Sequence, residues 1–98
     1  MCGIIGITSY KAVSSAIINS LKKLEYRGYD SAGMATLSNG VINEVKSKGR
    51  VDNLEKNLAI KNMLGFVGIG HVRWATHGIP NTVNAHPHSS ENVSIVHN

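Results

Sequence analysis

The sequence has very little cysteine: a single residue, Cys2, among 98. An internal disulfide is therefore impossible, and nothing indicates a secreted domain held together by such bonds. Long apolar runs are also missing, and the N-terminus has no basic segment of the kind that begins a signal peptide. We therefore expect a soluble cytoplasmic protein that has no membrane partner.

Aromatic side chains are scarce as well, at five residues, and the ten Lys and Arg are scattered along the chain. With a net charge of +4 and no basic stripe interleaved with aromatics, we expect no nucleic-acid partner. The contents of 42% hydrophobic and 16% charged residues are typical of a globular chain. Its length suits one small domain.

The only cysteine directly follows Met1 and opens an apolar, strand-like run, residues 1–7 (MCGIIGI). Because cysteine is small enough to permit removal of Met1, Cys2 is expected to become the mature N-terminus. Its thiol would then lie beside a free α-amine with a pKa of about 8. One residue would supply both nucleophile and base. Gly3 is expected to leave room beside the sulfur for substrate. The alternative is that Cys2 is a small buried hydrophobic residue.

The segment between residues 9 and 28 is expected to be a helix that packs on a sheet. Ser9 is its candidate N-cap and Gly28 its C-terminal stop. Its apolar residues recur at spacings of three and four: Val13, Ala16, Ile17, Leu21 and Leu24. In the polar turn that follows, Arg27 and Asp30 are interpreted from composition alone as a solvated pair.

A hairpin is predicted by Asn39-Gly40, which separates the strand-like residues 34–37 and 41–46. The pattern of apolar residues then predicts a short helix over residues 52–59. Its apolar side is expected to carry Val51, Leu54 and Leu58.

The glycine-rich residues 65–73 are interpreted as a central strand whose glycines allow a close approach by a backbone or a ligand. Residues 74–92 predict a long loop, which is either disordered or functional, and the pattern in residues 93–96 predicts a last strand. Antiparallel pairing together with helices predicts a layered α+β fold or a sheet sandwich.

The start of the long loop gathers polar and aromatic chemistry directly after a strand. Arg73 offers the two-pronged contact that a carboxylate prefers, and Trp74 can exclude water from a site. Thr76 and His77 add a hydroxyl and an imidazole. At the end of the last strand, the Asn98 amide is either an oxyanion donor or an ordinary turn former.

Two further loop histidines, His86 and His88, raise the question of a metal. They lie too close together for the usual zinc spacing, and the one cysteine is far away in the sequence. We therefore expect them to form hydrogen bonds that hold the loop, and we expect neither a metal nor a cofactor.

Three motifs in this sequence resemble one enzyme family. The start, MCGIIGI, resembles that of class II glutamine amidotransferases, which have the N-terminal-nucleophile hydrolase fold, an αββα sandwich. Residues 24–33 (LEYRGYDSAG) and 70–78 (GHVRWATHG), with 84–88 (NAHPH), resemble the branch that aminates fructose 6-phosphate in amino-sugar synthesis. The amidophosphoribosyltransferase branch typically has different residues in the two longer motifs.

The resemblance implies a reaction and a role for each matching residue. The Cys2 thiolate would attack the side-chain amide of L-glutamine, releasing ammonia and leaving a thioester that water hydrolyses. Arg73 would bind the glutamine carboxylate, Thr76 and His77 would hold the loop and substrate, and Trp74 would belong to the closing loop. Asn98 would form part of the oxyanion hole, with Arg27 bracing the nucleophile from behind.

The family's oxyanion motif is His-Asn-Gly, and the printed sequence reaches only its first two residues, His97 and Asn98. We therefore expect residues 1–98 to be a partial glutamine amidotransferase domain. Fructose 6-phosphate would bind only through a C-terminal domain not included here, and full-length members of the family are usually homo-oligomeric. The alternative is a catalytically inactive remnant or interaction fragment. For the chain alone we expect no activity, low stability, and partly exposed apolar faces on the first helix and on residues 66–69.

Overall fold

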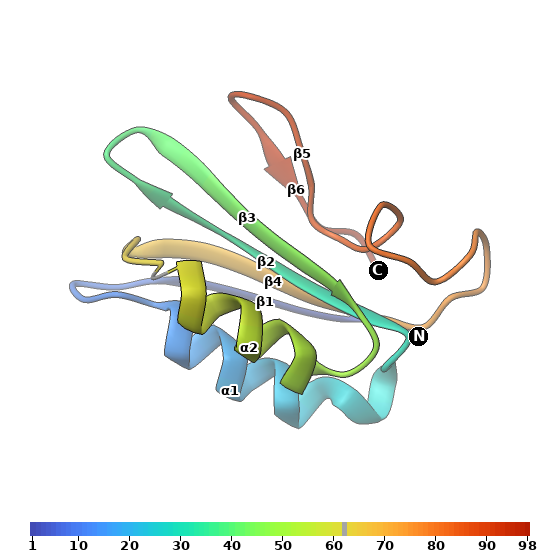
Figure 1. Cartoon of the computed structure of the whole chain (residues 1–98). Coiled ribbons are helices and arrows are strands. Elements are labelled where there is room, and N and C mark those ends of the chain that lie inside the picture. The colour runs from blue at the N-terminus through green and yellow to red at the C-terminus, as the bar shows by residue number, and fades with distance from the viewer. Residues whose placement is uncertain (62) are drawn as a thin grey trace.

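A computed structural model describes residues 1–61 and 63–98, except for the side chains of residues 58–61. Six strands, two α-helices and one 3-10 helix follow one another in this part of the chain (Figure 1). Their bounds are β1 Gly3–Thr8, α1 Ser14–Leu24, η1 Glu25–Arg27, β2 Ser31–Ser38, β3 Val41–Lys48, α2 Val51–Lys61, β4 Val67–Arg73, β5 His88–Ser89 and β6 Ser94–Ile95.

The main sheet has four antiparallel strands in the order β1-β4-β2-β3, so that β4 is internal, as predicted. Helices α1 and α2 lie side by side on one face, while the segment from residue 74 onward lies over the other (Figure 1). We call the face without helices the open face. An antiparallel sheet with helices on one face confirms the α+β class.

The predicted hairpin is present, with Ser38 paired to Val41 across a two-residue turn. Asn39 and Gly40 have φ angles of 52° and 76°. Positive φ at both central residues is what this tight turn requires, and Asn and Gly tolerate it best. Pairing runs from Ser31–Lys48 to the turn, so both strands are longer than the apolar pattern suggested.

Helix α1 begins later than predicted, with Val13 rather than Ser9 at its N-cap position. The Ser9 backbone N–H instead donates to the Phe66 carbonyl, 2.9 Å away, and joins the turn after β1 to the start of β4. Ala16 is exposed while Ile18 is buried. Adjacent helical residues point about 100° apart, and the buried stripe is centred on Ile17 and Leu21, so it extends to Ile18 rather than to Ala16.

The core lies between the helices and the sheet and includes Ile17, Leu21, Met34, Leu54 and Val72, all fully buried. The expected exposure of the α1 stripe is therefore wrong, because the sheet and α2 cover it. The prediction of partly exposed apolar residues at the start of the glycine-rich run is confirmed, because Phe66 and Val67 are 52% and 45% exposed.

Two glycines of β4 explain how closely α1 packs on the sheet. A Cβ at Gly68 or Gly70 would lie only 2.6 or 2.7 Å from side-chain carbons of Ile17. The predicted close approach at these glycines is real: the Ile17 side chain approaches both, and at Gly68 the Ala35 backbone carbonyl oxygen would also lie 3.0 Å from the Cβ.

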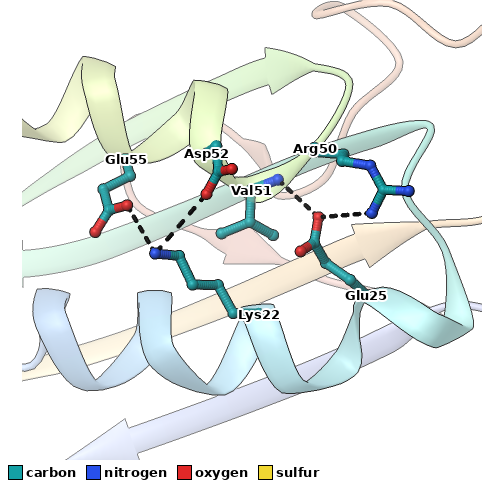
Figure 2. A network of polar contacts seen from close by, with 6 residues as sticks. All are labelled: Lys22, Glu25, Arg50, Val51, Asp52 and Glu55. Carbon is teal, nitrogen blue, oxygen red and sulfur yellow. Dashed lines mark hydrogen bonds and ion pairs between the residues drawn. The ribbon is translucent and has the colours of Figure 1, made fainter.

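Helix α2 starts one residue earlier than predicted, and Val51 and Leu54 are buried as expected. Leu58, which was predicted on the same apolar side, is not among the residues whose side chains are described. Polar contacts join this helix to α1 and η1 (Figure 2). The Val51 N–H donates to Glu25 Oε2 at 3.1 Å, and Lys22 Nζ lies 2.8 Å from Glu55 Oε1. Glu25 thereby satisfies a free N–H at the start of α2 and fixes η1 next to it.

Beyond β4 the chain folds over the open face, and its only regular structure is the two-residue pairing of β5 with β6. The predicted last strand exists but is shorter, and its partner β5 lies within the predicted loop. Of the helices described, none is long and apolar enough to cross a membrane.

Candidate active site around Cys2

Three segments that are far apart in the sequence meet at Cys2. Its backbone N–H donates to Asn98 Oδ1 at 3.0 Å, and its carbonyl accepts from Arg27 Nε at 3.0 Å. The thiol lies 3.9 Å from the Trp74 carbonyl oxygen. Cys2 is only partly buried. It is therefore not the fully buried small hydrophobic residue of the alternative interpretation.

The predicted solvated pair of Arg27 with Asp30 is wrong. Arg27 faces Cys2, as above, while Asp30 Oδ2 accepts from the Ala75 N–H at 2.8 Å and the Asp30 N–H donates to the Arg73 carbonyl. The carboxylate satisfies a backbone donor that the end of β4 leaves unpaired. Asp30 therefore holds the beginning of the loop whose Trp74 carbonyl faces the thiol.

Gly28 explains how η1 fits beside this loop. A Cβ there would lie 2.5 Å from the Arg73 carbonyl carbon and the Trp74 nitrogen. Its φ of 172° is extended and is accessible to any residue. Gly28 follows the helical segment, as predicted. Glycine is required there because the backbone of Arg73 and Trp74 passes too close to leave room for a side chain.

The expected role of Gly3 is corrected in the same way. It is buried, and a Cβ there would lie 2.9 Å from Val72 Cγ2 and 3.0 Å from Leu24 Cβ. The missing side chain makes room for the end of α1 to pack against the sheet. The space it leaves is filled by core atoms and is not open to a substrate.

Arg73, at the end of β4, is buried and holds the loop that follows it. Its guanidinium donates to the carbonyl oxygens of His77, Gly78 and Ile79, the last two at 3.3 Å. Thr76 and His77 themselves are exposed. The structure thus brings Arg73 and the backbone of its loop together, with the Thr76 and His77 side chains on the outside.

Trp74 lies at the surface beside residue 2. Its ring meets Tyr29 edge-on, with centroids 6.5 Å apart, and it lines a hollow of about 250 Å³ with Met1, Tyr26 and Arg27. Arg27 Nη2 lies 3.9 Å from the Met1 sulfur. Met1 therefore occupies one wall of the hollow next to Cys2.

Three histidines lie next to one another on the open face. The His71 and His86 rings are nearly parallel with centroids 4.2 Å apart, and His88 lies 4.5 Å beyond His86. His71 Nε2 lies 2.8 Å from the His97 carbonyl oxygen, and the His97 N–H donates to His86 Nδ1 at 3.3 Å. The predicted hydrogen-bonding role is confirmed for His86.

Burial keeps the two inner rings neutral. Loss of water lowers the pKa of His71, and loss of water together with the neighbouring His71 lowers the pKa of His86 to about 4. Within the described parts of the chain, no group of three or more His, Cys, Asp or Glu side chains could hold a metal ion.

The sequence patterns did not single out Glu25 and His71, and they gave Asp30 the wrong partner. All three residues lie inside the longer motifs, residues 24–33 and 70–78. The pattern gave their positions, but it did not show that the Asp30 carboxylate reaches Ala75 or that His71 reaches His97, 45 and 26 residues away.

The fold is similar to that of a glutamine amidotransferase. The chain superposes on the glutamine phosphoribosylpyrophosphate amidotransferase from B. subtilis, determined in complex with ADP and GMP, with a TM-score of 0.76 and 25% identity. The match covers 96% of this chain and 20% of that one. No protein-family model matches the chain.

In sequence, the chain corresponds over its whole length to the N-terminal part of glutamine–fructose-6-phosphate aminotransferases (isomerizing). Identity is 52% with the enzyme of Agrobacterium fabrum, 53% with that of Mesorhizobium japonicum and 55% with that of Clostridium acetobutylicum. In each case the match covers 100% of this chain and 16% of the relative. The chain therefore spans about one sixth of the length of these relatives.

Proposed function

We propose that this chain is part of the glutaminase domain of a glutamine–fructose-6-phosphate aminotransferase, and that Cys2 is its nucleophile. The observation that carries the proposal is the meeting of residue 2 with Asn98, Arg27 and Trp74 from three distant segments. Residues 1–98 would be a partial domain of an αββα sandwich in a cytoplasmic, homo-oligomeric enzyme. Fructose 6-phosphate would bind to a part of the enzyme outside these residues.

The reaction begins with proton transfer from the Cys2 thiol to its own α-amine, once Met1 has been removed. The thiolate attacks the side-chain carbonyl carbon of glutamine. The protonated α-amine then gives its proton to the leaving nitrogen, and the C–N bond breaks to release ammonia and leave a γ-glutamyl thioester. Water then cleaves the thioester, giving glutamate and the free thiol. The net reaction is glutamine plus water to glutamate plus ammonia, and the ammonia would pass to fructose 6-phosphate.

The Asn98 side chain suits the role of oxyanion donor. Because its Oδ1 accepts from the residue 2 nitrogen, its Nδ2 hydrogens can serve another acceptor near residue 2. An amide donor at that point stabilises the negative charge that develops on the substrate oxygen.

Arg73 would bind the glutamine α-carboxylate with guanidinium hydrogens that the loop carbonyls leave free, since arginine has five N–H donors. Trp74 would close over the hollow beside residue 2, and Thr76 and His77 would contact substrate from the exposed loop. Arg27, through its bond to the Cys2 carbonyl, would keep the nucleophile in place.

The test is a chimera in which this chain replaces the matching 98 residues of the Agrobacterium fabrum aminotransferase, 52% identical to it. We expect the chimera to release glutamate from glutamine and to form glucosamine 6-phosphate, and the Cys2→Ser variant to lose both activities. Ammonia supplied directly should restore sugar amination in that variant. A chimera that folds and aminates with free ammonia, yet does not hydrolyse glutamine, would favour the inactive remnant.

Removal of Met1 is tested separately by intact-mass measurement of the protein made in cells. We expect a mass that lacks one methionine, since the α-amine of Cys2 is the base. If nearly every molecule kept Met1 while the chimera was fully active, the proposed base would be wrong.

A further inference from the structure

The peptide group of His97, one residue before Asn98, is bonded to an imidazole on each side. His71 Nε2 lies 2.8 Å from its carbonyl oxygen, and its N–H donates to His86 Nδ1 at 3.3 Å. Because a carbonyl oxygen can only accept, His71 must carry its proton on Nε2. By the same reasoning His86 Nδ1 must be unprotonated.

His71 is well placed to act as a fixed support. It lies in the internal strand β4, is fully buried, and is paired with Ile4 on one side and Gly33 on the other. A Cβ at Gly33 would lie 2.0 Å from the His86 carbonyl oxygen. The glycine therefore allows the His86 backbone to rest directly on the sheet, where its ring stacks on His71.

We propose that His71 and His86 are positioning residues that hold the His97 peptide group and thereby place the Asn98 side chain against residue 2. The proposal rests on the function proposed above, and it adds a role for two residues to which that mechanism assigns no step. Strand β4 would then support both sides of the site, because Arg73, two residues after His71, holds the loop at residues 77–79.

The neutral state of the two rings supports the arrangement. Loss of water lowers the pKa of both, to about 4 for His86. At neutral pH His86 Nδ1 is therefore free to accept the His97 N–H.

The variants separate the hydrogen bonds from the packing of the rings. His71→Leu and His86→Leu remove the donor and the acceptor, whereas His71→Gln and His86→Asn keep a donor or an acceptor near the same position. His88→Leu is the control, because the His88 ring packs against His86 at an angle of 55° and does not bond to the His97 peptide group.

Two measurements follow, one of them independent of catalysis. In the chimera we expect either leucine variant to lower kcat for glutamine hydrolysis about 100-fold, since displacement of a catalytic group by 1 Å has an effect of this size. The KM should change less than about 2-fold, because the carboxylate contact lies elsewhere. In the same chimera, hydrogen exchange at the His97 amide should become faster in these variants. The Gln and Asn variants should restore both values, and His88→Leu should change neither.

Unchanged exchange and unchanged kcat in His86→Leu would overturn the proposal, as would an equal loss in His88→Leu. If His71→Leu does not fold, the proposal is decided by the variants His86→Leu and His86→Asn, since His86 is only partly buried. A wild-type chimera without glutaminase activity would refute the proposed function and not this inference, which the exchange measurement would then decide.

Discussion

The two faces of the four-stranded sheet are held by different forces. On the helix face, apolar side chains such as Ile17, Leu21 and Met34 are fully buried. On the open face, the segment after β4 is held by polar contacts from His71, Arg73 and Asp30, while nearby apolar residues such as Val93 and Ile95 remain exposed.

Burial of apolar area is strong and needs no particular orientation, so the helix face determines whether the chain folds. Hydrogen bonds contribute less net stability but fix direction and distance, so the open face determines where Asn98 and the loop lie relative to Cys2. Mutations on the two faces should therefore affect different observables.

The largest effect on stability is expected for Leu21→Ala on the helix face. Removal of a fully buried leucine side chain leaves a cavity and lowers the free energy of unfolding by about 2–5 kcal/mol. Leu64→Ala is the matched control, because Leu64 is 59% exposed, and it should change that free energy by less than about 0.5 kcal/mol. Equal effects in urea unfolding would show that the core does not lie where the structure puts it.

On the open face, Arg73→Ala should act mainly on substrate binding in the chimera. Loss of a charge-assisted contact to a carboxylate costs about 1.5–3 kcal/mol, so the KM for glutamine should rise about 10- to 150-fold. Arg73→Lys keeps the charge without the planar fork and should give a smaller increase. An unchanged KM in Arg73→Ala would show that Arg73 only holds the loop carbonyls.

Glu25 connects the two regions, because it binds the start of α2 and directly precedes Tyr26 and Arg27. Glu25→Ala removes the acceptor for the Val51 N–H and should lower the free energy of unfolding by about 0.5–2 kcal/mol, the usual range for a lost helix cap. Lys22→Met, which breaks only the solvent-exposed contacts with Asp52 and Glu55, should leave the urea midpoint unchanged. The reverse ranking would contradict the capping role.

The last prediction concerns pH and His86. In the folded protein its pKa is about 4, whereas in the unfolded chain it is about 6.5. Between these values the unfolded chain binds more protons, so stability should rise with pH from about 4 to 6.5. His71, whose pKa is also lowered, acts in the same direction.

The measurement compares urea midpoints at pH 4.5 and pH 7 in the wild type and in His86→Asn. The variant keeps the acceptor but does not titrate, so its midpoint should depend less on pH. Identical pH dependence in the two proteins would show that His86 titrates normally in the folded state.

Most of the elements could be predicted from the sequence, because their causes are local. Asn39-Gly40 predicted the tight turn, since few other residue pairs accept positive φ at both positions. The spacing of Val13, Ile17 and Leu21 predicted α1 and its buried face. The boundaries were less accurate where the cause was not local: Ser9 could cap a helix, but pairing with Phe66 uses its N–H instead.

The candidate site shows the same division. The sequence by itself determined which chemical groups are present: the thiol of Cys2, the guanidinium of Arg73 and the amide of Asn98, each inside a motif. Only the tertiary structure decided what each group faces. Gly3 serves core packing, Asp30 binds the Ala75 N–H rather than Arg27, and the His97 peptide group is held by two imidazoles. The physical reason is that a residue pattern records local preferences, whereas these contacts join residues 11 to 96 positions apart and exist only after β4 and the segment beyond it have packed on the sheet.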